Sequence, residues 1–171
     1  LHYDIGPDKG RYACPVKMGW GDRCPMCEEV GLLSREDDED SEQQAYDLKA
    51  KPTDLCYIVD RKDPDKGPQP WMMPRKKIAE NLAEISIDER TGAIVPLTHP
   101  QKGRDILFSR EGSRKRTDYG GLKLDVEATP LSDDPNEEGE WLNFIAENRL
   151  PDLLIHYDYD YLKRVFGGAA S

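Results

Sequence analysis

One histidine and three cysteines near the start of the sequence have the residue types and spacing of a metal site. His2, Cys14, Cys24 and Cys27 offer one imidazole and three thiolates, a set that satisfies tetrahedral Zn²⁺ in closed structural sites. Cys24 and Cys27 matter most, because a two-residue spacer lets both sulfurs point into one tetrahedron. Cys14 begins a Gly-rich stretch that can return to this pair. We therefore predict a single structural Zn²⁺ held by these four side chains.

The same cysteine pair has two other interpretations. Its C-P-M-C sequence matches the C-P-x-C of glutaredoxin-like oxidoreductases, in which the pair follows a hydrophobic strand and opens a helix. Here residues 19–23 precede it and read Gly-Trp-Gly-Asp-Arg, which is typical of a turn. The cysteines could also be ordinary reduced thiols, a description that suits Cys56 within the apolar stretch 55–59. Zinc binding is the interpretation that uses all four residues.

The sequence shows no other set of residues that predicts catalysis. His99 precedes a proline and indicates a turn, and His156 stands among tyrosines, where we expect a packed helix residue. Carboxylates are plentiful only in acidic stretches, where nothing shields them enough to tune an acid–base pair. No Ser/His/Asp set and no Gly-rich phosphate loop is present in the sequence. We expect that the protein is not an enzyme.

Charge is unevenly distributed along the chain. The formal net charge of −10 argues at first against nucleic-acid binding, which needs cations facing phosphates. The acidic residues, however, are concentrated in 36–42 and 133–140, and basic clusters occur at 75–77 and 110–116. Acidic runs are most often solvated loops. Net charge alone therefore does not exclude a local basic surface.

Aromatic residues alternate with these cations along the sequence. Binding of single-stranded nucleic acid combines aromatic rings, on which bases stack, with Lys and Arg that follow the phosphates. For any one aromatic residue a half-buried core position is an equal alternative, above all for Tyr57 and Trp71. Tyr119 lies outside any apolar pattern. The candidate contacts are Trp20, Tyr57, Arg61, Trp71, Arg75, Lys76, Arg110, Arg114, Lys115, Arg116 and Tyr119.

Apolar periodicity and turn residues predict the elements that would position these side chains. The predicted helices are 28–33, 41–50 with Ser41 as its N-cap, 75–87, a helix around Trp141, and 151–166 opened by Pro151. The predicted strands are 55–59, 71–73, two short strands around Thr91-Gly92, 104–110 and 122–128, the last two forming a long hairpin with a basic tip. Short strands covered by a few helices indicate an antiparallel barrel or sandwich, so we predict a mainly β fold with covering helices in one domain, 1–171.

No apolar run approaches the roughly 20 residues needed to span a bilayer, which argues against a membrane protein. The chain opens with Leu1 rather than Met and shows no signal-peptide pattern. We therefore expect a trimmed piece of a longer protein.

Several of these residues carry a resemblance to a known family. The order His2, Cys14, Cys24-Pro25-Met26-Cys27-Glu28 resembles the zinc lobe of single-stranded-DNA-binding proteins of T-even-type bacteriophages. The likeness continues at Lys62-Asp63-Pro64, Lys76-Lys77-Ile78, Gly103, Tyr119 and 161–167. The chain departs from the family pattern in a His2-to-Cys14 spacing one residue shorter, and in Leu55 and Met72, which stand near family aromatics.

The resemblance implies both a fold and a function. The fold would be an OB-fold-like antiparallel barrel with an inserted zinc-binding lobe at 1–34. The function would be sequence-nonspecific binding of single-stranded DNA in replication, recombination and repair, in the cytoplasm of a bacterial host cell. Replication and recombination proteins would be partners through the acidic segments. Apart from this resemblance, a zinc-containing protein-interaction module without DNA affinity and a glutaredoxin-like oxidoreductase remain as alternatives.

Overall fold

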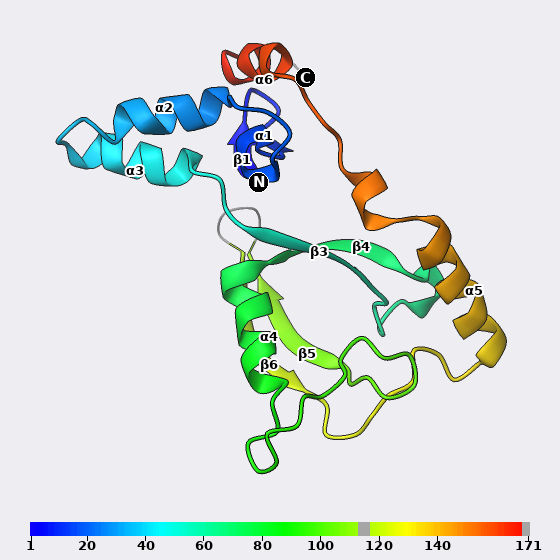
Figure 1. Ribbon diagram of the computed structural model, residues 1–171. Helices are drawn as coiled ribbons and strands as arrows, with labels where there is room; N and C mark the ends of the chain where they lie inside the picture. Colours follow the sequence, from blue (N-terminus) through cyan, green and yellow to red (C-terminus); the bar gives the residue numbers. More distant parts are fainter. Residues whose placement is uncertain (113–116, 169–171) are drawn as a thin grey trace. The chain divides into compact units, whose positions relative to one another are not determined.

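The computed structural model describes residues 1–112 and 117–168 of the chain. Its chain divides into two compact units (Figure 1). Unit 1 consists of Leu1–Pro52 and Pro151–Ser171, and unit 2 consists of Thr53–Leu150.

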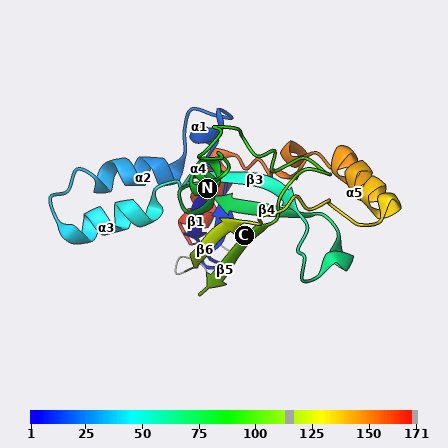
Figure 2. The same cartoon turned by 90° about the horizontal axis from the view of Figure 1, so that it is seen from below.

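Unit 1 combines a short hairpin with four helices. Its strands are β1 (His2–Ile5) and β2 (Gly10–Tyr12), which pair antiparallel. Its helices are α1 (Pro15–Met18), α2 (Pro25–Leu33), α3 (Glu39–Leu48) and α6 (Tyr159–Phe166), and the 3₁₀ turn η4 (Leu150–Leu153) stands at the boundary. The helices α2 and α3 run side by side in both ribbon views (Figures 1 and 2).

Local sequence explains where these helices begin. Pro25 occupies the first turn of α2, where its missing N–H costs no hydrogen bond. Asp38 caps α3 by accepting a hydrogen bond from the backbone N–H of Ser41, so Ser41 lies inside the helix rather than at its cap as predicted. Asp158 caps α6 in the same way. The prediction of one helix over 151–166 was wrong, because Pro151 opens only a 3₁₀ turn and the α-helix begins at Tyr159.

The core of unit 1 joins the N-terminal hairpin to α6. The buried residues Ile5, Tyr12, Met26, Leu162 and Val165 belong to one cluster with two cysteines of the predicted metal site. The approach of α6 is close, because a Cβ added to Gly6, whose φ is +71°, would come within 2.8 Å of Val165. The last helix of the chain therefore packs on the segment that carries the predicted metal ligands.

Unit 2 contains two hairpins and four helical segments, two of which follow one another directly. The strands are β3 (Thr53–Ile58), β4 (Gln69–Pro74), β5 (Ile106–Glu111) and β6 (Asp118–Leu124). The helical segments are η1 (Pro64–Lys66), η2 (Arg75–Ala79, of π type), α4 (Glu80–Ile85) and α5 (Pro135–Glu147). Ile78 and Leu82 form the buried side of the η2–α4 segment.

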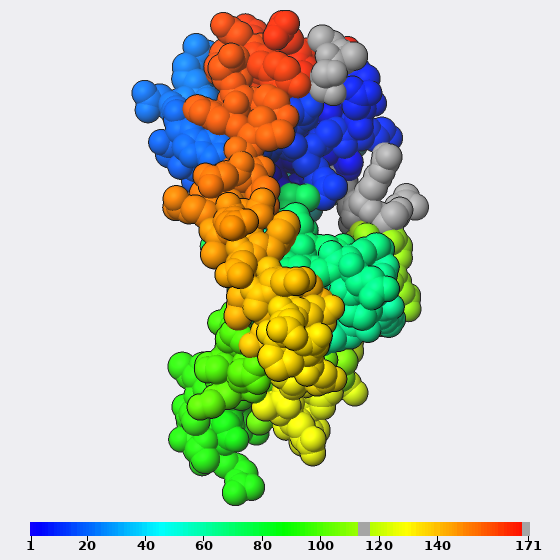
Figure 3. Space-filling model, turned by 90° about the vertical axis from the view of Figure 1, so that its right-hand side faces the viewer, coloured from blue at the N-terminus to red at the C-terminus, as the bar shows by residue number. Residues whose placement is uncertain are grey.

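Two contacts hold α5 against the β3–β4 hairpin. Phe144 meets the ring of Tyr57 edge-on at 6.0 Å, and Trp141 lies over Gly67, where an added Cβ would come within 3.1 Å of the indole nitrogen. Figure 3 shows the surface of α5 (yellow to orange) next to that of the β3–β4 hairpin (green). This face of the hairpin is therefore covered by a helix.

The prediction of a mainly β, OB-fold-like barrel was wrong. The structure has 38 % helix and 21 % strand, and over the described residues it forms only three two-stranded antiparallel sheets, β1–β2, β3–β4 and β5–β6, without a closed barrel. The two strands expected around Thr91-Gly92 reduce to a single bridge between Ile87 and Ile94. The chain that follows makes turns at Pro96 and His99, and prolines cannot donate to a sheet ladder. The strands needed to join the hairpins into a barrel are therefore missing from 87–105.

No helix in the described part of the chain is long and apolar enough to cross a membrane.

Candidate metal centre

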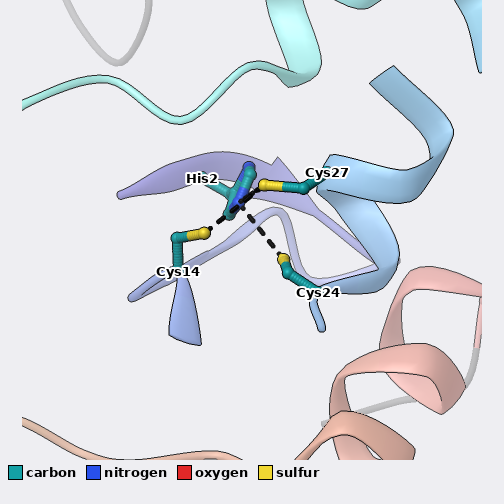
Figure 4. Close-up of side chains that lie close together, drawn as sticks. All are labelled: His2, Cys14, Cys24 and Cys27. Atoms are coloured by element: carbon teal, nitrogen blue, oxygen red, sulfur yellow. Dashed lines mark hydrogen bonds between the residues drawn. The ribbon is translucent and has the colours of Figure 1, made fainter. Parts of the chain in front are cut away.

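Three short elements of unit 1 bring the four predicted ligands together. His2 is the first residue of β1, Cys14 immediately precedes α1, and Cys24 is the N-cap of α2 with Cys27 in its first turn. Figure 4 shows the four side chains pointing toward one another. Neither cysteine that precedes a helix makes a side-chain cap hydrogen bond. Their sulfurs are thus directed to the cluster rather than to the helix ends.

The donor atoms are close enough to share one ion. The Nε2 atom of His2 lies 3.5 Å from Cys24 Sγ and 3.7 Å from Cys27 Sγ, and Cys14 Sγ lies 3.4 Å from Cys27 Sγ. All four donor atoms lie within 4.8 Å of one another. His2, Cys14 and Cys24 are buried and Cys27 is half-buried.

These separations match those of a tetrahedral zinc site. With Zn–S near 2.3 Å and Zn–N near 2.0 Å, a regular tetrahedron places two sulfurs ~3.8 Å apart and nitrogen ~3.5 Å from sulfur. The observed nitrogen–sulfur distances of 3.5 and 3.7 Å agree with this geometry, and the sulfur–sulfur distance of 3.4 Å requires a small outward shift. Four ligands and no open position are typical of a structural rather than a catalytic ion. The donor set therefore fits Zn²⁺.

A hydrogen bond to the backbone orients the imidazole ligand. His2 Nδ1 lies 2.7 Å from the carbonyl oxygen of Leu48, the last residue of α3. A carbonyl only accepts hydrogen bonds, so Nδ1 must carry the proton and Nε2 has its lone pair free for a metal. Partners of this kind fix the tautomer and the ring orientation of metal-binding histidines. The helix α3 thus supports the site without supplying a ligand.

Burial sets the protonation of the ligands in the absence of an ion. It lowers the pKa of His2, which keeps the imidazole neutral as a ligand requires. Burial also raises the pKa of Cys24, and burial with the neighbouring cysteines raises the pKa of Cys27 to about 12. A metal ion must therefore displace protons from these thiols before it binds.

The same facts argue against a glutaredoxin-like role for the pair. A redox-active cysteine needs an accessible sulfur and a lowered pKa. Cys24 is buried, with 1 % of its surface exposed, and the pKa of both Cys24 and Cys27 is raised. The fourth cysteine, Cys56, stands apart in β3, where burial raises its pKa as well.

The prediction of a metal cluster at these four residues is therefore confirmed as a His/Cys₃ set within metal-ligand distance. No family model, curated protein or solved structure matches this chain. The identity of the ion and the resemblance to phage proteins consequently stay predictions.

Two of the predicted DNA-contacting aromatics in unit 2 lie in one row of rings. The rings of Trp71 in β4 and Phe108 in β5 are stacked, with centroids 5.7 Å apart and an interplanar angle of 5°. Phe108 meets Tyr119 of β6 edge-on at 5.8 Å. Arg110 pairs with Tyr119 across the β5–β6 hairpin, so both side chains lie on the same face. We call Trp71, Phe108 and Tyr119 the aromatic row.

Sequence reasoning missed Phe108 as a member of this row. A usable signal was present, because the alternation along β5 places Phe108 on the same face as Arg110. Tyr57 has a different environment. It stands on β3 opposite Pro70, one position away from Trp71 in the ladder, so it faces the other side of the hairpin, where it packs on α5 and donates a hydrogen bond to the carbonyl of Asn148.

Two of the predicted cations in unit 2 are engaged with neighbouring groups. Arg61 pairs with Asp105 and donates to the carbonyls of Pro130 and Leu131. Arg75 pairs with Asp54 through two nitrogens. Lys76 and Arg110, in contrast, are exposed, and their side chains make no hydrogen bond or ion pair with a described residue.

The remaining candidates lie elsewhere. Trp20 belongs to unit 1, where its ring contacts that of His156 at 4.9 Å. Arg114, Lys115 and Arg116 lie outside the described residues.

Proposed function

We propose that the protein binds single-stranded DNA without sequence preference, through the aromatic row of unit 2, and that a structural Zn²⁺ in unit 1 stabilises its fold. The observation that carries the proposal is the alignment of Trp71, Phe108 and Tyr119 on strands of two different hairpins. Phe108 is 37 % exposed, and Trp71 and Tyr119 are half-buried. Rings in contact with solvent leave faces or edges available to bases.

The physical case rests on stacking. A base on an aromatic ring contributes about 1–3 kcal/mol, and any base can stack because each has a π face. A row of rings therefore binds a strand without reading its sequence. Stacking also favours single strands, because the bases of a duplex are already stacked on one another.

Cations near the row would hold the phosphates. Among the described candidates, Lys76 in η2 and Arg110 in β5 are the exposed side chains without a protein partner. With roughly −0.7 per phosphate on single strands, two such contacts give a slope of log K against log salt near −1.4. The affinity is therefore expected to depend moderately on salt.

The test is titration of a fluorescent oligothymidine by wild type and by two variants that each lose one aromatic ring. Phe108→Ala removes the central ring of the row and should weaken binding by about 1–3 kcal/mol, that is about 5- to 150-fold, with an unchanged salt slope. The control is Tyr46→Ala, which removes an exposed ring from α3 of unit 1 and should leave binding unchanged. Equal binding by wild type and Phe108→Ala, or a duplex bound as tightly as a single strand of the same length, would refute the proposal.

A further inference from the structure

An ion pair between Asp54 and Arg75 stands beside the aromatic row of unit 2. In the β3–β4 hairpin Trp71 pairs with Cys56, and Met73 pairs with Asp54. Side chains two residues apart on a strand share one face of the sheet. Asp54 and Trp71 are therefore diagonal neighbours on the same face, about 7–8 Å apart. A DNA strand that stacks on Trp71 would pass close to this carboxylate.

The carboxylate of Asp54 occupies the guanidinium group in the way that a phosphate would. Arg75 donates from two nitrogens, and its Nε lies 3.2 Å from each carboxylate oxygen. The planar fork of arginine fits carboxylate and phosphate groups alike, because both offer two oxygens to parallel N–H donors. Hydrogen bonds from Arg75 lower the pKa of Asp54 from its ordinary value, so the carboxylate is charged at neutral pH. Asp54 and a DNA phosphate are therefore alternative partners of Arg75.

The pair is accessible to such a competitor. The side chain of Arg75 is 50 % exposed and that of Asp54 is 30 % exposed. Arg61 differs, because it pairs with Asp105 and also donates to two backbone carbonyls. The guanidinium of Arg75 bonds to Asp54 alone among the described residues. An exposed ion pair of this kind contributes little to folding stability, so its main effect is to occupy a cation beside the row.

We infer that Asp54 limits the affinity for single-stranded DNA by occupying Arg75 in place of a phosphate, a role that rests on the proposed function. While Asp54 is charged, the phosphate contacts come from Lys76 and Arg110, whose side chains are free of described partners. When its charge is removed, Arg75 becomes a third contact and a repulsion between carboxylate and phosphate disappears. The consequence of Asp54 is weaker binding that also depends less on salt.

The experiment measures oligothymidine binding by the full, zinc-loaded chain over a series of salt concentrations. Two phosphate contacts give a slope of log K against log salt of about −1.4 for wild type, and a third contact gives about −2.1 for Asp54→Asn. The affinity of Asp54→Asn at low salt should be about 3- to 10-fold higher. The double variant Asp54→Asn/Arg75→Gln should return to a slope of about −1.4, because it lacks the guanidinium.

Asp63→Asn is the matched control. It removes the same charge and releases Lys66, whose Nζ lies 2.6 Å from the carboxylate of Asp63 at η1. The freed cation belongs to the turn of the β3–β4 hairpin rather than to the row, so the slope should stay at about −1.4. Asp54→Thr serves as a second neutral variant, because threonine suits a strand, and it should give the same slope as Asp54→Asn. Thermal unfolding verifies that each variant is folded.

Three results would overturn the role of Asp54. The first is a wild-type slope in both neutral variants. The second is an equally steep slope in Asp63→Asn, which would assign the effect to net charge. The third is a steep slope that persists in the double variant, which would assign the new contact to another cation. If any of these occurs while Phe108→Ala still weakens binding, the proposed function stands without this role. Absence of binding by wild type and Asp54→Asn alike refutes both.

Discussion

Removal of the metal is expected to unfold unit 1 and leave unit 2 folded. The perturbation is dialysis of the protein against a strong zinc chelator under reducing conditions. Two of the seven buried residues of the core of unit 1, Cys14 and Cys24, are themselves ligands. The β1–β2 hairpin, α2 and α6 meet at this core. Loss of the ion therefore acts on the packing of the whole unit rather than on one loop.

Two free energies, that of zinc binding and that of packing the apolar core, lead to the expected unfolding of unit 1. A structural zinc site contributes an apparent ~10–16 kcal/mol at neutral pH, most of it folding free energy. A single core in a unit of about 70–80 residues rarely supplies more than ~3–5 kcal/mol without a staple. The metal thus exceeds what the apolar core of unit 1 can provide alone. Unit 2 contains Ile78, Leu82 and Trp141 as buried residues and none of the four ligands.

Amide ¹H–¹⁵N spectra measure this directly, because each unit gives its own signals. On chelation the signals of α2, α3 and α6 should collapse to unfolded positions, while those of β3–β6 and α5 stay in place and serve as the internal control. Addition of one equivalent of Zn²⁺ should restore the first set. Retention of the dispersed signals of unit 1 in demonstrably zinc-free protein would show that the core is sufficient and that the reasoning is wrong.

Metal affinity should rise with pH, because binding removes a proton from each cysteine thiol, whereas burial lowers the pKa of His2 so that it is already neutral. The release of up to three protons per ion changes Kd by up to ~10³-fold per pH unit. Competition with a chromophoric chelator measures this Kd, and a pH-independent value would contradict the prediction. Arg61→Ala should lower the free energy of unfolding of unit 2 by about 1–2 kcal/mol in urea, since Asp105 and two backbone carbonyls lose their hydrogen-bond donor. The exposed control Lys62→Ala should change this free energy by less than about 0.5 kcal/mol.

The candidate metal ligands were predictable from the sequence because part of their geometry is local. Cys24 and Cys27 are placed by one helical turn, so their spacing alone indicates the site. The support for the imidazole was not predictable. Leu48 reaches His2 through its backbone carbonyl, and a backbone acceptor leaves no signature in residue type.

The hairpins were predicted in part and their assembly was not. The β3–β4 strands lie where they were expected, whereas the strand expected at 122–128 is β6 at Asp118–Leu124. The β3–β4 and β5–β6 pairs follow from alternation and turn residues, which are local signals. Whether two hairpins close into a barrel depends on strands that join them, and 87–105 forms turns with a single bridge instead. Periodicity indicates that a strand exists but not which strand lies beside it.

Two of the cations that the sequence predicts as DNA contacts in unit 2, Arg61 and Arg75, pair with aspartates of the same unit. Clusters of Lys and Arg in the sequence indicate a local positive field only when their counterions are absent. Asp54 pairs with Arg75 from 21 residues away, and Asp105 pairs with Arg61 from 44 residues away. Such long-range pairs are invisible in a sequence with a net charge of −10. For the described part of unit 2, the proposed binding of DNA would therefore depend more on the rings of the aromatic row than on phosphate contacts.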